Sequence, residues 1–196
     1  CCCRRADTSG SYERERYNRY IRIHCRIFSD DDIRCCTLKK IGLSLVYGGD
    51  VVLYTPLVIK AIKYAYNAHH GQYDVSGVPY IFHPYHLAEQ FNSETEVCAA
   101  LLHDVIEDTD ITLEELCEEF PHKVTDAVRL LTHTDGEDYF DYVMKLKDNP
   151  VARAVKLADL RHNMDESRFT GVKDVSEEQR IRWREKYSRA YDILTD

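Results

Sequence analysis

From Thr55 to the end of the chain, signals for the start of an α-helix follow one another with only short breaks. A helix start is favoured by Ser, Thr, Asp or Asn at the N-cap, by Glu or Gln three residues later, and by Pro at the first helical position. Such starts occur at Thr55-Pro56, Ser93 with Glu96, Thr112 with Glu115, Pro121, Asp138, Pro150, and Ser176 with Gln179. No hairpin pattern accompanies them, so the sequence predicts an all-α fold.

Two of these starts make specific predictions about helix extent. Ser93 with Glu96 predicts a helix that runs to about Glu107. Ser176 with Gln179 begins the last helix, in which Ile181, Tyr187, Tyr191 and Ile193 repeat at amphipathic spacing. The aromatic residues of this helix, including Trp183, are interpreted as core residues or as contacts between copies of the chain, that is, a homo-oligomer.

Residues 1–50 differ in character from residues 51–196. They hold most of the cysteines, are rich in Arg, and show no sustained helical or alternating pattern. We therefore expect the folded domain to occupy residues 51–196 and residues 1–50 to be a poorly patterned N-terminal segment. Two alternatives stay open for that segment: a poorly ordered native extension, or sequence upstream of a start at Val52.

Composition excludes several functional classes. The formal net charge of -8 argues against binding to a nucleic acid polymer, which normally requires a basic face. Apolar runs such as Cys98 to Leu102 are far too short to span a bilayer, and no export signal is evident. We expect a cytoplasmic protein with reduced thiols, in which Cys98 and Cys117 lie buried on apolar helix faces.

The pair His103-Asp104 directly follows the apolar run that ends at Leu102. Charged groups at the end of a buried helix are costly unless they are paired or bind a metal. Helical spacing places Glu107 on the face of His103 and Asp108 on that of Asp104. This acidic cluster lies at a helix C-terminus, where the helix dipole disfavours negative charge. A divalent cation would relieve the repulsion.

A second candidate region lies downstream, where Asp159 follows the mostly apolar run from Val155. Asn163 is four residues later, on the same helix face. Together with a distant His and the His-Asp pair, Asp159 completes a mixed imidazole and carboxylate set. Such a set suits Mn, Fe, Co or Zn better than Ca and leaves coordination positions open for water. Lys156 is one turn earlier and could reach a phosphate.

Three longer strings carry a family resemblance. They are Ala68-His69-His70-Gly71-Gln72 continuing through Ser76-Gly77-Val78-Pro79-Tyr80-Ile81 to His83-Pro84, Ala99 to Thr109 around His103-Asp104, and Lys156-Leu157-Ala158-Asp159 with His162-Asn163-Met164. Across about residues 55 to 166 the chain resembles the hydrolase domain of the RelA/SpoT alarmone enzymes. The resemblance implies an HD-domain helical bundle in which the metal ligands come from separate helices.

The resemblance also implies roles for single residues. His83, His103, Asp104 and Asp159 match the ligands of one Mn²⁺ ion, and Glu107 and Asp108 match the pair that positions and activates the attacking water. Asn163 matches a substrate contact, and Ser76 falls in the nucleotide-facing loop. The implied reaction removes the 3′-pyrophosphate from guanosine tetra- or pentaphosphate to give GDP or GTP. The other histidines, including His162, are interpreted as packing or surface residues.

One position departs from the family pattern. Alarmone hydrolases carry a nucleotide-contacting Arg two residues after the Gln that matches Gln72, whereas this chain has Asp74. The exchange removes a cation and adds an anion beside an anionic ligand. Two alternatives therefore stay open: an HD phosphohydrolase that acts on another phosphorylated nucleotide, and a non-catalytic, nucleotide-binding regulatory module. The paired Glu107 and Asp108 speak against the second.

Overall fold

The structure is a computed structural model that describes residues 54–169 and 175–196. Within these residues the secondary structure is helical, and the extended backbone pairs only at an isolated bridge between Tyr73 and Pro79. The all-α prediction is therefore confirmed. The predicted N-terminal segment, residues 1–50, lies outside the described residues. Among the described helices, none is long and apolar enough to cross a membrane.

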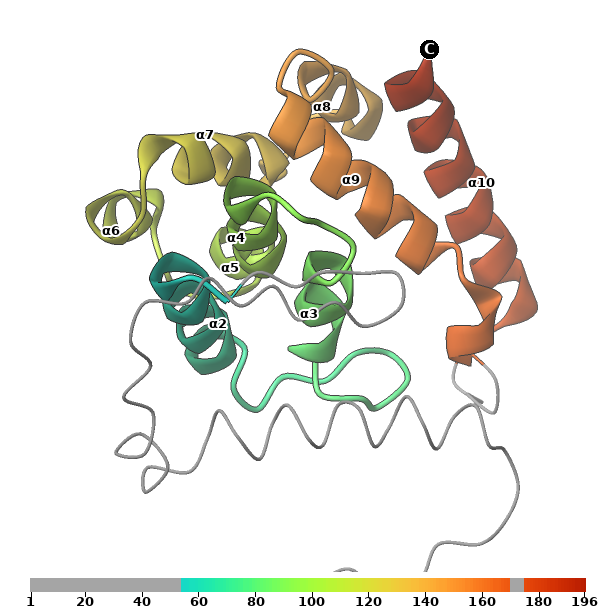
Figure 1. Ribbon diagram of the computed structural model, residues 1–196. Coiled ribbons are helices and arrows are strands. Elements are labelled where there is room, and N and C mark those ends of the chain that lie inside the picture. Colours follow the sequence, from blue (N-terminus) through green and yellow to red (C-terminus); the bar gives the residue numbers. More distant parts are fainter. Residues whose placement is uncertain (1–53, 170–174) are drawn as a thin grey trace, which may run out of the picture. The chain divides into compact units, whose positions relative to one another are not determined.

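The elements follow one another closely along the chain (Figure 1). In chain order they are α2 Pro56–Ala68, α3 Phe82–Ala88, α4 Glu94–Leu102, α5 Val105–Asp108, α6 Leu113–Glu119, α7 His122–Leu131, α8 Tyr139–Lys145, α9 Pro150–Asn163, the 3₁₀-helix η2 Glu166–Phe169, and α10 Glu177–Thr195.

Helix α4 is the centre of the core. Every residue from Val97 to Leu102 is buried, and α4 packs against α2, α3, α7 and α9, which surround it in Figure 1. A helix that is apolar on all sides is expected only where neighbours cover each face. Burial of side chains such as Leu101 and Leu102 contributes about 1.5–3 kcal/mol each relative to exposure. This packing fixes the position of the C-terminal end of α4.

Local capping chemistry explains most helix starts. Thr55 Oγ1 accepts a hydrogen bond from the backbone N–H of Val58, and Thr112 with Glu115 forms the predicted reciprocal capping box. Asn149 caps α9 by accepting from Ala152 N–H at 2.9 Å. Helix α9 begins at Pro150, as the sequence predicts.

The predicted helix from Ser93 to about Glu107 was wrong in two respects. Ser93 stands at the N-cap but its side chain makes no capping hydrogen bond, and α4 ends at Leu102 before α5 begins at Val105. The break has a local cause. His103 Nδ1 lies 2.9 Å from the carbonyl oxygen of Ala100, the acceptor that the N–H of Asp104 would use in a continuing helix.

Two further expectations need correction. Ile181 is exposed, because the face of α10 that packs on α8 and α9 is centred on the buried Ala190 and Leu194. Tyr187 lies half-buried on that face, as does Trp183, whose ring packs on Phe169. Among the cysteines, Cys98 is buried as expected, but Cys117 is exposed.

We expect Leu101→Ala to lower the free energy of unfolding by about 2–5 kcal/mol, because truncation leaves a cavity in the centre of the core. Ile59→Ala on α2 is the matched control, since Ile59 is 41% exposed and should lose less than about 1 kcal/mol. Urea unfolding of both variants measures the difference. Equal losses would show that α4 is not the centre of the cooperative core.

Candidate metal centre

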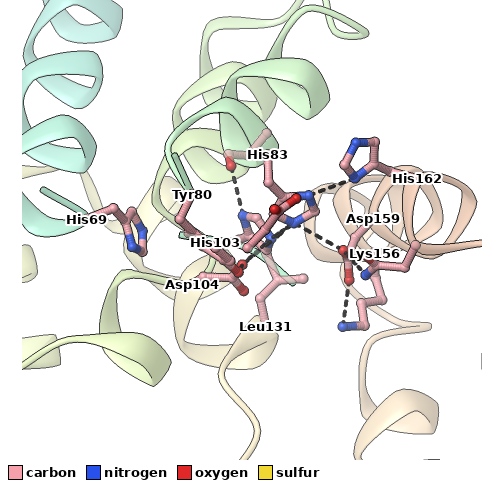
Figure 2. Close-up of polar contacts among 12 residues, drawn as sticks. His69, Tyr80, His83, His103, Asp104, Leu131, Lys156, Asp159 and His162 are labelled. Carbon is pink, nitrogen blue, oxygen red and sulfur yellow. Dashed lines mark hydrogen bonds and ion pairs between the residues drawn. The ribbon is translucent and has the colours of Figure 1, made fainter. Parts of the chain in front are cut away.

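Side chains from three parts of the fold meet at the C-terminal end of α4 (Figure 2). His83 comes from α3, His103 and Asp104 from the break between α4 and α5, and Asp159 from α9. His83, His103 and Asp159 are buried, and Asp104 is largely so. The helix packing around α4 thus brings together the four residues that the sequence analysis predicted as metal ligands.

Ligand atoms of these four residues point at a common position. His83 Nε2 lies 3.2 Å from His103 Nε2, 3.6 Å from Asp104 Oδ2 and 3.3 Å from Asp159 Oδ1. His103 Nε2 lies 2.9 Å from Asp104 Oδ2. His83, His103 and Asp104 form the tightest group, with ligand atoms all within 4.8 Å of one another. Asp159 reaches the group through its contact with His83.

The outer nitrogen of each imidazole ring has its own partner. His103 Nδ1 donates to the carbonyl of Ala100, and this bond leaves a lone pair on Nε2 when the ring is neutral. His83 Nδ1 lies 2.8 Å from His162 Nδ1. Burial, together with His83 and Arg168, lowers the pKa of His162 to about 2, so His162 is neutral and can accept from His83. In the neutral tautomers that these two outer contacts favour, both candidate ligand histidines present the lone pair of Nε2 to the group.

The two carboxylates favour a positive charge at Nε2 of His103, which either a proton on that nitrogen or a bound metal ion supplies. Burial opposes protonation of His103, yet the Asp104 and Asp159 carboxylates outweigh it and raise the pKa of His103 to about 9. Burial likewise opposes ionisation of Asp104 and Asp159, but the neighbouring His103 and Lys156 hold their pKa values low. The donor chemistry fits a divalent transition metal with open positions for water.

Neighbouring side chains orient the two carboxylates. The hydroxyl of Tyr80 donates to Asp104 Oδ2 at 2.5 Å. On Asp159, Oδ1 accepts from Asn163 Nδ2 at 2.6 Å and Oδ2 accepts from Lys156 Nζ at 2.9 Å. Such outer contacts commonly fix the geometry of ligand side chains.

Lys156 and Asn163, predicted as substrate contacts, therefore lie against a candidate ligand. The sequence analysis missed Tyr80 and assigned His162 to packing. The spacing of Tyr80 before His83, one turn at the start of α3, is the signal that could have indicated it.

The acidic pair Glu107 and Asp108 lies on α5, just beyond the four candidate ligands, and both residues are exposed to solvent. Glu107 Oε2 accepts from the backbone N–H of His133 at 3.1 Å. Partial desolvation and the charge of Asp104 raise the pKa of both carboxyl groups. A carboxylate with a raised pKa that stays open to water is suited to accept a proton from that water.

Basic and aromatic side chains gather around Lys156, which contacts Asp159. Lys156 Nζ lies over the Tyr142 ring at 5.5 Å, and Lys186 of α10 lies over the Tyr139 ring at 3.7 Å. Burial and the charge of Lys156 lower the pKa of Lys186, while Glu107 opposes the shift. Lys186 was not predicted, because its position on α10 carries no motif that links it to the site.

Ser76, the remaining predicted site residue, lies in the loop between α2 and α3. Its Oγ donates to the backbone carbonyl of Arg168 in η2 at 2.9 Å. Gln72, from the same loop, donates to the backbone carbonyl of Asp108 at 2.8 Å. The loop is thus tied both to α5 and to η2, on either side of the candidate metal ligands.

One family model and several known proteins are similar to this chain. Residues 61–189 match the family model described as an HD domain. The chain is 37% identical over 126 residues to the probable GTP pyrophosphokinase of Mycobacterium leprae. The aligned region covers 58% of this chain and 16% of that protein. It is 38% identical over 115 residues to the guanosine-3′,5′-bis(diphosphate) 3′-pyrophosphohydrolase of Haemophilus influenzae, covering 51% and 17% respectively. The chain therefore spans less than a fifth of the length of either relative.

A solved structure, described as "A metazoan ortholog of SpoT hydrolyzes ppGpp and plays a role in starvation responses", has a similar fold. The TM-score is 0.60 at 24% sequence identity, and the match covers 72% of this chain and 86% of that chain. At this identity the match supports the arrangement of the helices.

We expect His103→Ala and Asp104→Ala each to weaken Mn²⁺ binding by more than about 100-fold, beyond the roughly 10- to 100-fold effect of removing a supporting group. His122→Ala, an exposed His on α7, is the matched control and should bind as the wild type does. Calorimetric titration of the full chain measures all three. The cysteines of residues 1–50 are present in every variant, so differences report on this site. Unchanged affinity in both ligand variants would refute the assignment.

Proposed function

The chain belongs to the HD-domain family, and from that premise we propose that it is a metal-dependent phosphohydrolase that removes the 3′-pyrophosphate from guanosine tetra- or pentaphosphate. The observation that carries the proposal is the meeting of His83, His103, Asp104 and Asp159 beside the exposed pair Glu107 and Asp108. The printed name of the Haemophilus influenzae relative supports this choice of substrate.

We propose that His83, His103, Asp104 and Asp159 hold one Mn²⁺ ion. Bound there, the ion supplies positive charge that makes a water more acidic and neutralises charge on the phosphoryl group. The chain's own contribution begins with orientation. Tyr80 and Asn163 hold the two carboxylates by hydrogen bonds, and Lys156 holds Asp159 by an ion pair.

In hydrolysis the oxygen of a water bonds to the phosphorus that is attached to ribose O3′. The bond between that phosphorus and O3′ breaks. Glu107 accepts a proton from the attacking water, because its carboxylate is exposed and its pKa is raised by partial desolvation and by Asp104. Asp108 shares that environment and orients the same water. O3′ leaves with the electron pair of the broken bond and takes up a proton from solvent, Glu107 releases its proton to solvent in turn, and the products are pyrophosphate and GDP or GTP.

Two alternatives keep some support. Asp74 stands where the RelA/SpoT family carries Arg, which favours a different phosphorylated nucleotide as substrate. A non-catalytic regulatory module is less consistent with the raised pKa values of Glu107 and Asp108 beside the candidate metal ligands. We also propose that residues 51–196 form the catalytic domain. The expected cytoplasmic location and homo-oligomer stay predictions.

We expect the full chain to release pyrophosphate from guanosine tetraphosphate in the presence of Mn²⁺, and Asp104→Ala to release none above background. Loss of Asp104 removes a ligand and the partner of His103 together. Chromatographic separation of GDP and pyrophosphate measures the reaction. If the folded, metal-loaded wild type leaves guanosine tetraphosphate intact, the substrate assignment fails and other phosphorylated nucleotides become the candidates.

We expect Glu107→Gln to lower kcat by about 10²- to 10⁴-fold while Mn²⁺ affinity stays unchanged, because the amide cannot accept the proton. Glu114→Gln is the matched control, since Glu114 is an exposed acidic residue at the start of α6. Steady-state kinetics and metal titration measure the two effects separately. Full turnover by Glu107→Gln would assign the proton transfer to another group.

A further inference from the structure

Asp74 shapes the loop that precedes α3. Its Oδ1 accepts from the backbone N–H groups of Ser76, at 2.8 Å, and Val78, at 3.0 Å. Gly77 adopts a φ of 76°, a conformation that favours glycine, and completes the turn. These bonds occupy one carboxylate oxygen and leave Oδ2 facing out of the turn. Asp74 is therefore a structural part of the loop and not a loose anion at its surface.

The second oxygen of Asp74 meets a cation from a distant part of the chain. Arg168 of η2 places Nη2 3.4 Å from Asp74 Oδ2, and both side chains are more than four-fifths buried. The contact is longer than the 2.7–2.9 Å usual for a charge-assisted hydrogen bond, so the pair is loosely held. It nevertheless offsets the negative charge that Asp74 brings to the loop.

Arg168 also contacts two of the three predicted substrate contacts, Asn163 and Ser76. Nη1 donates to Asn163 Oδ1 at 3.0 Å, and the Arg168 carbonyl accepts from Ser76 Oγ at 2.9 Å. Asn163 in turn donates to Asp159, a candidate metal ligand, at 2.6 Å. The guanidinium thus lies two hydrogen bonds from the metal centre and beside the nucleotide-facing loop.

The guanidinium keeps donors for a ligand. An arginine side chain carries five N–H groups. Within the described residues, the bonds to His162 O, Asn163 Oδ1 and Asp74 Oδ2 use three of them. One N–H of Nη2 and the Nε N–H are left for an anion. A planar fork with spare donors beside a loosely held carboxylate is suited to bind a phosphate.

We propose that Arg168 is a specificity-determining residue that binds a phosphate group of the nucleotide. The proposal rests on the proposed function, because Ser76 and Asn163 define the nucleotide side only if that function holds. Arg168 supplies from η2 the positive charge that the RelA/SpoT family supplies with an Arg at the position of Asp74. The departure at Asp74 is then a relocation of the cation.

The competing explanation is that Arg168 has only a structural role, in which it holds the loop between α2 and α3 against the end of α9. The two explanations predict different effects on the steady-state kinetics. A phosphate contact affects KM and depends on the positive charge, whereas a structural role affects the melting temperature and kcat. Arg168→Gln removes the charge, and Arg168→Lys keeps it without the fork. Arg161→Gln is the matched control, because Arg161 is an exposed cation on the last turn of α9.

The experiment measures kcat and KM for guanosine tetraphosphate with the Mn²⁺-loaded full chain. We expect Arg168→Gln to raise KM about 10- to 100-fold, as loss of a charged hydrogen bond should, with kcat within about twofold. Arg168→Lys should give an intermediate KM, and Arg161→Gln the wild-type value. Thermal unfolding of each variant checks that it is folded. If Arg168→Gln does not fold, Arg168→Lys carries the test through the same separation of KM from kcat.

Dissociation constants for guanosine tetraphosphate, measured in the Glu107→Gln background, separate binding from turnover. Weaker binding by Arg168→Gln in that background supports the proposal. An unchanged KM with a lowered kcat and melting temperature overturns it and leaves the proposed function standing. A wild type that neither binds nor hydrolyses guanosine tetraphosphate overturns the proposed function, and the role of Arg168 with it.

Discussion

The site depends on the burial of α4, because two of the helices that cover it, α3 and α9, carry candidate ligands and two further candidates directly follow its last residue. His83 lies on α3 and Asp159 on α9, and both helices pack against α4. The packing that removes Leu101 and Leu102 from water therefore also brings three donor segments to one point. A change in how α3 or α9 sits on α4 would move a ligand, so core packing and site geometry are the same constraint.

The second constraint is the presence of buried carboxylates. Charge in a poorly solvated environment is costly unless it is paired and hydrogen-bonded. Asp104 has Tyr80 and His103 as partners, and Asp159 has Lys156 and Asn163. These contacts hold the carboxylates in place before any ion or substrate arrives. The conformational entropy of these ligand side chains is therefore lost during folding, and ion or substrate binding does not have to order them.

Sequence reasoning succeeded where a feature depends on nearby residues. The capping box of Thr112 with Glu115 and the start of α9 at Pro150 follow from side chains within one turn. It failed where distant packing decides. The face that α10 buries depends on the positions of α8 and α9, so periodicity placed Ile181 wrongly.

The site shows the same division. The family motifs predicted the residues that meet at the end of α4, but the partners of those residues were harder to find. His162 contacts His83 across 79 positions and Arg168 contacts Asp74 across 94, and neither pair shares a motif spacing. The break after Leu102 depends on the rotamer of His103, which composition and spacing do not fix.

The loop between α2 and α3 reaches both sides of the site, through Gln72 to the backbone of α5 and through Ser76 to that of η2. The four candidate ligands, by contrast, come from helices or from the junction of α4 with α5. Exchange of loop residues can therefore alter what fits beside the centre while the helices keep the centre itself intact. An architecture of this kind lets the reaction stay constant while selectivity evolves, so related chains could diverge in substrate by remodelling one short surface segment.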